Sequence, residues 1–266
     1  MHWIGIDFGT TNSAAAMIEQ QSFAETLGGP SRDLPFPSMI AFHQETFQFG
    51  FDALRASLTD GDSNLIVTGL KPQLGRTPEI RVGPKVFETE KLVTDYLTYL
   101  VGRLFGGKHV PRPLGAVIAT PVEFRPAHRH SLLRAAREAG ISQVEFVYEP
   151  TAAVYSAVQG GDFPSGPVGV IDWGGGTVDI TIVRCSRSPD RIEDLNVNAR
   201  SEGLGGRDLD LRILSVALSR SADAQNWFDS SNRSVQSSIL SRLERGKIAY
   251  LSTGSLGRNV AFWHQD

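Results

Sequence analysis

The sequence predicts an α/β fold with two lobes, and three observations carry this prediction. Short apolar strands alternate along the chain with segments of helical spacing. A strand, an aspartate and a turn rich in glycine and threonine follow one another twice, at residues 7–12 and 172–177. The 266 residues exceed the usual size of a single domain. We therefore expect two modest domains, with one of the two turns in each.

The N-terminal part of the chain supplies most of the expected strands and helices. Apolar residues recur at helical spacing after Glu88 until Gly106 and Gly107 stop the helix. Pro126 suits the first residue of another helix, which Gly140 ends. A stretch rich in glycine and proline at 28–37 is expected to lead into a subdomain. The expected elements are strands at 2–7, 13–19 and 22–26, a helix at 88–105, a strand at 114–119, a helix at 126–140, a strand at 144–147 and a helix at 150–158.

The C-terminal part begins with a second hairpin, expected at residues 168–184. Helical spacing returns at 209–219 and 235–251. The segment 223–238 is polar and short of strong apolar periodicity, so it is predicted to be mobile. A last strand is expected at 256–263.

Composition and charge exclude several classes of protein. Hydrophobic residues make up 41% and charged residues 21%, as in ordinary globular proteins. A net charge of −3 gives no reason to propose nucleic acid or an anionic membrane as a partner. No apolar run approaches the roughly 18 residues of a membrane helix. The single cysteine, Cys185, excludes an internal disulfide. These features predict a cytoplasmic protein.

The two Gly/Thr turns have the chemistry that a phosphate needs. Glycine lets backbone N–H groups approach an anion closely, and threonine hydroxyls add hydrogen-bond donors. An aspartate at the end of the preceding strand can hold Mg²⁺ through water. Two turns of similar design suggest two lobes that bind one polyphosphate from opposite sides. The phosphate-contacting residues are predicted to be Gly9, Thr10, Thr11, Asn12, Gly174, Gly175, Gly176 and Thr177.

Four motifs carry a resemblance to a known family. They are GIDFGTTNS at 5–13, YEPTAA at 148–153, DWGGGTVD at 172–179 and GLGGRDLD at 203–210. In this order the chain resembles the ATPase region of DnaK-type heat-shock chaperones, within the actin and sugar-kinase superfamily. The resemblance implies an actin-like, ribonuclease H-like α/β ATPase fold whose two lobes surround a nucleotide cleft.

The resemblance also implies a division of the chain. Lobe I is expected at 1–162, with its core at 1–30 and 108–162 and an inserted subdomain at 31–107. The first part of lobe II follows at 163–266, with a core at 163–204 and a helical and strand subdomain at 205–266. The family's second Gly-rich adenosine loop has no counterpart before Asp266. Lobe II is therefore expected to be incomplete, in a fragment or in a naturally short chain, and to bind ATP poorly by itself.

By resemblance, Lys71 and Glu149 are the residues that handle the attacking water. Lys71 matches the family's catalytic lysine, which approaches the γ-phosphate and that water. A compact cation stabilises charge that builds up during phosphoryl transfer. Glu149 matches the glutamate that orients water near the magnesium ion. Without the resemblance, Lys71 is an ordinary loop lysine, and Glu149 is a carboxylate favoured by the dipole at a helix start.

Four further residues near the two turns take catalytic roles by resemblance. Asp7 and Asp172 position magnesium through its water shell, and Thr177 donates to phosphate oxygens. Asp179 either helps to hold the nucleophilic water or forms a hydrogen bond within its hairpin.

The adenosine side is predicted from the last motif and from the helix that follows. Backbone groups of Gly205 and Gly206, with Asp208 beside them, are expected to meet ribose and phosphates. Glu244 and Lys247 lie three apart on one helix face and match residues that line the adenosine pocket. Ile248 replaces the arginine that stacks on adenine in the family. Loss of that contact is worth about 0.5–2 kcal/mol, so nucleotide binding is expected to be weaker.

Pro121 and Arg129 match a proline relay and its arginine partner, which pass the nucleotide state to a substrate-binding domain. A strand-ending proline and a helical arginine are also common without such a role.

The function implied is a chaperone ATPase region that binds ATP or ADP with Mg²⁺ and uses hydrolysis to change the angle between its lobes. Unfolded polypeptide clients and co-chaperones would act through C-terminal parts that this chain lacks. Two alternatives stay open. One is a small-molecule kinase of the same superfamily, which needs an aspartate base near a sugar. The other is a nucleotide-sensing or filament-forming protein with little turnover.

Overall fold

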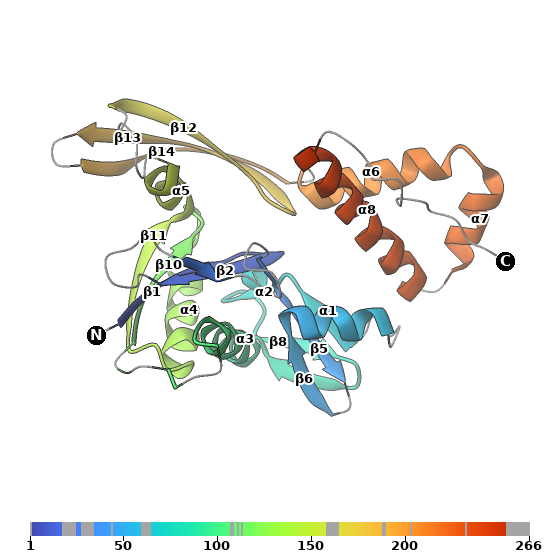
Figure 1. Ribbon diagram of the computed structural model, residues 1–266, viewed down its shortest axis with the longest axis horizontal. Coiled ribbons are helices and arrows are strands. Elements are labelled where there is room, and N and C mark those ends of the chain that lie inside the picture. The colour runs from blue at the N-terminus through green and yellow to red at the C-terminus, as the bar shows by residue number, and fades with distance from the viewer. Residues whose placement is uncertain are drawn as a thin grey trace. The chain divides into compact units, whose positions relative to one another are not determined.

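The computed structural model divides into two compact units (Figure 1). The first consists of Met1–Ala56, Asn64–Asp172 and Ile180–Ala199. The second consists of Ser57–Ser63, Trp173–Asp179 and Arg200–Asp266. The structure describes residues 2–17, 25–27, 35–43, 45–59, 65–106, 109–110, 112, 114–157, 165–187, 190–202, 204–231 and 233–253.

A mixed six-stranded sheet forms the centre of the first unit. Ile4, Ile6 and Phe8 of its strand β1 are buried at every second position, as expected for a strand with one face on the core. Strand β10 is buried almost throughout, which is typical of a parallel strand between two neighbours. The strands are β1 (His2–Phe8), β2 (Asn12–Met17), β3 (Glu25–Leu27), β4 (Phe36–Pro37), β10 (Leu114–Thr120) and β11 (Gln143–Tyr148).

Strand direction separates the two sides of this sheet. β1 runs parallel to β10, and β10 runs parallel to β11. β2 is antiparallel to β1, and it pairs with both β3 and β4. The expected strands at 2–7, 114–119 and 144–147 are confirmed. Those at 13–19 and 22–26 are confirmed in part, because residues 18–24 lie outside the described residues.

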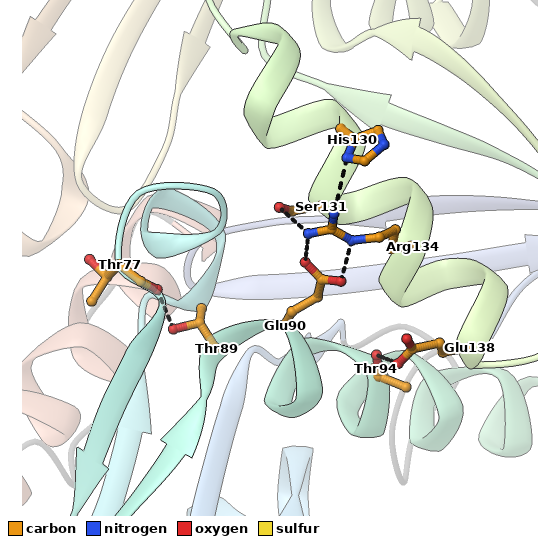
Figure 2. Close-up of polar contacts among 8 residues, drawn as sticks. All are labelled: Thr77, Thr89, Glu90, Thr94, His130, Ser131, Arg134 and Glu138. Carbon is orange, nitrogen blue, oxygen red and sulfur yellow. Dashed lines mark hydrogen bonds and ion pairs between the residues drawn. The ribbon is translucent and has the colours of Figure 1, made fainter.

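Helices α3 (Thr89–Leu104) and α4 (Pro126–Glu138) pack against each other, α3 also against β2 and α4 against β11. The predicted helices at 88–105 and 126–140 are thereby confirmed. Between the two helices, the guanidinium of Arg134 donates to both carboxylate oxygens of Glu90, at 2.6 and 2.5 Å (Figure 2). Two parallel hydrogen bonds of this kind also fix the relative orientation of their partners.

The region predicted as an inserted subdomain contains more structure than the one helix expected there. The rings of Phe42, Phe47 and Phe87 pack in tilted and edge-on orientations at centroid distances of 4.7–5.9 Å and give its strands an apolar contact. Its elements before α3 are β5 (Met39–His43), β6 (Thr46–Phe49), α1 (Gly50–Thr59), β7 (Ile66–Thr68), α2 (Leu70–Gln73), β8 (Glu79–Val82) and β9 (Lys85–Glu88). β5 pairs with both β6 and β7, and β8 pairs with β9.

A second sheet has the order β12–β13–β14. Its strands are β12 (Gly166–Trp173), β13 (Thr177–Arg187) and β14 (Asp190–Glu202). A small buried cluster joins Val154 of α5 (Glu149–Ala157) to Val183, Cys185 and Ile192 of this sheet. The hairpin expected at 168–184 is confirmed, and β14 is an additional strand.

The second unit contains helices α6 (Gly206–Leu218), α7 (Ala222–Ser230) and α8 (Arg233–Thr253), so the helices expected at 209–219 and 235–251 are confirmed. The segment 223–238, predicted to be mobile, contains most of α7. The hydroxyl of Ser221 accepts from the N–H of Ala224 and caps this helix, which buries none of its residues. The strand expected at 256–263 lies outside the described residues. Within the described ranges, no helix has both the length and the apolar character of a membrane span.

Candidate functional site

The parallel strands of the first unit bring three predicted residues to one edge of the sheet. Asp7 lies at the carboxyl end of β1 and pairs with Ala119 of β10. Pro121 follows β10, and Glu149 follows β11 as the first residue of α5. Carboxyl ends of adjacent parallel strands form the usual ligand site of an α/β sheet. The edge therefore carries a carboxylate from each of two strands.

Helix α2 brings Lys71 to this edge. Gly69, with φ 65°, turns the chain into the helix. Lys71 is only 5% exposed, and its ammonium forms an ion pair with Oε1 of Glu149, 78 residues further along the chain. The ammonium also lies 5.9 Å from the ring centre of Phe124. A lysine is rarely buried to this extent unless it is paired, so the contact with Glu149 accounts for its position.

Loss of hydration raises the pKa of Glu149 above its usual range, and the neighbouring Lys71 ammonium opposes this rise. Asp7 and Asp172 raise the pKa of Glu149 further by repulsion. The pKa of Asp7 is raised in the same way, first by loss of hydration and then by Asp172. Asp7 keeps surface exposed to solvent. The surrounding protein nevertheless removes enough water for this loss of hydration to be the main cause of its raised pKa.

These four groups do not balance in charge. The cluster contains the carboxylates of Asp7, Glu149 and Asp172 but one ammonium, that of Lys71, so acidic groups are in excess. Among the described residues, no group of three or more histidine, cysteine, aspartate or glutamate side chains could hold a metal directly. Mg²⁺ usually keeps several of its waters, so a cluster that holds it through water needs no such group. The arrangement suits a hydrated divalent cation.

The turn between β1 and β2 is held by serines. The hydroxyl of Ser38 donates to the carbonyl of Gly9 at 2.7 Å and lies 2.8 Å from the hydroxyl of Ser13. A Cβ at Gly9 would lie 2.0 Å from the carbonyl oxygen of Asn12, so only glycine fits this turn. A Cβ at Gly69 would lie 4.0 Å from the methyl group of Thr10, which places the turn beside the start of α2. Thr10, Thr11 and Asn12 are exposed and can donate to a ligand.

The second unit contains the other Gly-rich turn. The N–H of Gly174 donates to the carbonyl of Thr177 at 2.9 Å and closes the hairpin. The hydroxyl of Thr177 donates to the carboxylate of Asp179 at 3.0 Å, so Asp179 makes the hairpin hydrogen bond that was one of its two predicted roles. The stretch Gly174–Gly176 is called the glycine loop below.

The glycine loop packs against the start of α6. The N–H of Gly206 donates to the carbonyl of Gly174 at 3.0 Å, and the N–H of Arg207 donates to that of Gly175 at 2.8 Å. A Cβ at Gly205 would lie 2.5 Å from the carbonyl oxygen of Gly175. The two predicted Gly-rich motifs are therefore in direct contact, and the first N–H groups of α6 bind the loop.

On α8, Lys247 donates to the carboxylate of Asp210 at 2.9 Å and to the carbonyl of Gly206 at 2.7 Å. Glu244 lies one turn earlier and is partly exposed. Ile248 is 53% exposed at the position that resemblance assigns to adenine stacking.

Arg129 and Pro121 lie near the sheet edge of the first unit. The guanidinium of Arg129 lies over the ring of Tyr148, 4.9 Å from the ring centre. Tyr148 immediately precedes Glu149 in the sequence. The carbonyl of Pro121 accepts from the N–H of Phe124, whose ring faces Lys71. The two predicted coupling residues are therefore connected to the residues around the Lys71–Glu149 pair.

The structure thus collects the predicted residues within each unit. In the first unit, Lys71 pairs with Glu149, and Asp7 and Asp172 lie near this pair. In the second, the glycine loop, Gly205, Gly206 and Lys247 meet.

Sequence reasoning missed three supporting residues. Ser38 follows two prolines, Phe124 has an ordinary loop context, and Asp210 lies inside the last motif without an assigned role. Of these, only Asp210 carried a signal, because it is a second aspartate in GGRDLD.

Comparison with known proteins gives a consistent result. A family model described as Hsp70 protein matches residues 79–262. The chaperone protein HscA of Citrobacter koseri is 29% identical over 98% of this chain. The chaperone protein DnaK of Mycoplasma mobile is 26% identical over 97% of the chain, and HscA of Escherichia fergusonii is 30% identical over 97%. The chain spans 42–44% of the length of these three relatives.

Proposed function

The chain belongs to the Hsp70 family, and from this premise we propose that it is the nucleotide-binding region of a chaperone ATPase that binds and hydrolyses MgATP. The family has the actin-like ATPase fold, with which the mixed α/β structure agrees. One observation carries the proposal for the chemistry. A nearly buried lysine pairs with a glutamate at the edge of a parallel sheet, with two aspartates nearby.

The Lys71–Glu149 pair provides the groups for water attack on a phosphoryl group. The Lys71 ammonium would stabilise the negative charge that develops in the transition state, and its low exposure strengthens that effect. The Glu149 carboxylate would accept a hydrogen bond from the attacking water and orient it. Because Phe124 faces Lys71, the ammonium has a limited choice of positions.

Asp7 and Asp172 suit a hydrated magnesium ion. Loss of hydration and, to a smaller extent, repulsion from Asp172 raise the pKa of Asp7, and a nearby cation would relieve the repulsion. Magnesium, when bound, would offset the charge of the phosphates. We assign both aspartates as acceptors for the waters around it, and the donor chemistry of the cluster supports this assignment.

Nucleotide binding is assigned to both turns. Thr10, Thr11 and Asn12 would donate to phosphates from the first unit, as would the N–H of Gly9. The glycine loop would do so from the second unit, and Thr177 would join it when its hydroxyl turns from Asp179, to which it donates in the structure. The residues proposed for the adenosine side are Gly205, Gly206, Glu244 and Lys247.

The lobes proposed are residues 1–162 and 163–266. Pro121 and Arg129 would pass the nucleotide state onward, and the stacking of Arg129 on Tyr148 supports this role. Clients and co-chaperones would bind through parts of the relatives' length that this chain does not cover.

The test begins with titration of the chain with MgADP and MgATP, followed by phosphate release under single-turnover conditions. We expect weak binding, because Ile248 replaces the stacking arginine, and low-micromolar or tighter affinity would contradict that expectation. Glu149→Gln should lower the release rate at saturating ATP. Glu145 on the preceding strand is exposed, so Glu145→Gln should not change the release rate.

The two alternatives give different results in the same assays. Turnover that appears only when a sugar is added identifies a small-molecule kinase. ATP-dependent sedimentation without phosphate release identifies a filament-forming or sensing protein. Either result contradicts the proposed hydrolysis.

A further inference from the structure

We propose that Asp210 is a positioning residue, which acts through Lys247 and the start of α6 to hold the glycine loop in place. The inference rests on the proposed function in one respect, namely that the glycine loop binds phosphate. Every contact used lies within the second unit.

Asp210 occupies a position that a helix normally gives to an apolar residue. α6 buries only Asp210 and Leu214, which lie four residues apart on the face toward α8. Asp210 is 4% exposed. A buried carboxylate costs free energy unless it is paired, and an apolar side chain would pack there without that cost. The charge therefore points to a role other than packing.

Lys247 connects Asp210 to the first turn of α6. Its ammonium donates to Oδ2 of Asp210 at 2.9 Å and to the carbonyl of Gly206 at 2.7 Å. Within the described residues, Oδ1 of Asp210 is buried and has no hydrogen-bond partner. In the part of the chain that the structure describes, Lys247 is therefore what holds the carboxylate, and the two contacts together set the direction of its ammonium.

Gly206 passes this constraint to the glycine loop. Its carbonyl accepts from Lys247, while its N–H donates to the carbonyl of Gly174. The next N–H, from Arg207, donates to the carbonyl of Gly175. A Cβ at Gly206 would lie 3.2 Å from the Lys247 ammonium, so α8 approaches the backbone closely. Three elements therefore form one hydrogen-bonded chain from α8 through α6 to the loop.

Loss of this chain should change binding more than chemistry. Without the charge of Asp210, Lys247 loses one of two contacts and Gly206 is held on one side only. The loop N–H groups would then lose their fixed direction. Lys71 and Glu149 are not part of the chain, so the rate at saturating nucleotide should persist.

The experiment compares Asp210→Asn, Lys247→Met and the double variant with the control Asp223→Asn, an exposed aspartate on α7. Amide hydrogen exchange is measured by NMR for Gly206 and Arg207 without nucleotide. Both single variants should accelerate it by roughly 10- to 100-fold, the worth of a charge-assisted hydrogen bond, and the double variant by no more than either single one. Lys247→Arg should restore slow exchange. In Asp210→Asn, MgADP affinity should fall by a similar factor, while the rate at saturating ATP stays constant.

The outcomes separate this inference from the proposed function. Unchanged exchange at Gly206 and Arg207 overturns the positioning role. Acceleration that extends equally to the amides of α3 indicates general destabilisation and also overturns it. If wild-type chain does not bind MgADP, the proposed function fails, while faster exchange in the variants still supports the link from Asp210 to the loop.

Discussion

Two lysines of this chain, Lys71 and Lys247, pair with carboxylates in ways that invite comparison. Their side chains are 7% and 12% exposed, and the partners Glu149 and Asp210 are 20% and 6% exposed. Around Lys71, Asp7 and Asp172 add negative charge beyond what the lysine neutralises. Around Lys247, the second contact is the neutral carbonyl of Gly206.

The difference shows that neighbouring groups, rather than the pair itself, determine what such a pair can do. The cluster with Lys71 keeps an excess of carboxylate, and the pKa values of Glu149 and Asp7 are raised, mainly by loss of hydration and further by repulsion between the carboxylates. Such a cluster can attract a cation and handle water. The contacts of Lys247 are satisfied internally, so that pair can fix a backbone position but offers little chemistry.

The largest expected effect separates the two lysines by their kinetics. Lys71→Ala should reduce phosphate release at saturating ATP by about 10²–10³-fold, because a preorganised charge at the transition state is lost. ATP should still bind. Lys247→Met should instead raise KM and leave kcat nearly unchanged. Single-turnover phosphate release over a range of ATP concentrations measures both parameters.

Lys91→Ala is the matched control, because this exposed lysine of α3 pairs with Asp95 of the same helix, at 2.5 Å. Equal loss of kcat in the Lys71 and Lys247 variants would remove the distinction between chemistry and anchoring. Unchanged turnover in Lys71→Ala would remove Lys71 from the mechanism.

Substitution of two glycines tests the backbone segments that lie next to the two lysines. A Cβ at Gly75, just after α2, would lie 3.0 Å from the backbone of Ala127, at φ +71°. Gly75→Ala should cost about 1–2 kcal/mol for the left-handed backbone and about 1–3 kcal/mol more for overpacking. Gly205→Ala has an ordinary φ of −71°, so only the overpacking cost of about 1–3 kcal/mol applies. Thermal unfolding measures both costs.

Gly106→Ala is the control for backbone strain alone, since its φ is +61° and no atom lies within 4 Å of the added Cβ. It should cost about 1–2 kcal/mol. The two variants should also differ in the kinetics of phosphate release. Gly75→Ala should lower kcat, and Gly205→Ala should raise KM. A Gly75→Ala variant as stable as Gly106→Ala would show that α4 yields to the new side chain.

The pH dependence of stability provides a smaller effect, specific to the Lys71 cluster. The folded pKa of Asp7 lies above the ordinary value of 3.8, and that of Glu149 above 4.5. Their protonated forms are therefore favoured by folding. This stabilisation is present below the ordinary values and is lost as pH rises through the raised pKa values. Asp7→Asn should flatten this decline in the free energy of unfolding, measured with urea from acid to neutral pH.

Asp223→Asn should leave the pH profile unchanged, because this aspartate is exposed on α7. Magnesium should reduce the decline in wild type, since a cation near the cluster favours the ionised carboxylates. A profile that is identical in wild type and Asp7→Asn would mean that Asp7 keeps its ordinary hydration.

The elements predictable from sequence are those with a local signal. The apolar spacing of Leu92, Tyr96 and Leu100 predicts α3. Helix α7 buries none of its residues, and its clearest local signal is the cap at Ser221. The sheet of β5, β6 and β7 depends on pairing between segments with weak local patterns. Its stability comes from tertiary contacts such as Phe42 with Phe87, which no short window contains.

The candidate site divides in the same way. Asp7, Lys71 and Glu149 could be named as candidates because each matches a residue of the family, and the structure adds that Lys71 and Glu149 are paired across 78 residues. Asp210 and Ser38 could not be assigned roles. A charged residue on a helix is expected to face solvent, and only the partner 37 residues away explains why Asp210 is buried. Ser38 acts through the geometry of another turn.

The smallest effect is expected at a third ion pair, which lies between α3 and α4 (Figure 2). Arg134 is 52% exposed and Glu90 23%, and Arg134 also contacts His130 at 3.2 Å. A double-mutant cycle with Arg134→Met and Glu90→Gln should give about 0.2–1 kcal/mol, despite the two-fold hydrogen bonding, because solvent and salt screen the pair. Urea unfolding at low and high salt measures it.

This pair also titrates in the opposite sense to Asp7. Arg134 lowers the pKa of Glu90, so its stabilisation is present above the ordinary value of 4.5 and is lost as pH falls through the lowered pKa. The same cycle with Asp210→Asn and Lys247→Met should give a larger and less salt-sensitive coupling, because water is excluded from that pair. If the exposed pair couples as strongly as the buried one, burial does not determine the strength of these pairs. The anchoring assigned to Lys247 would then need a source other than its ion pair.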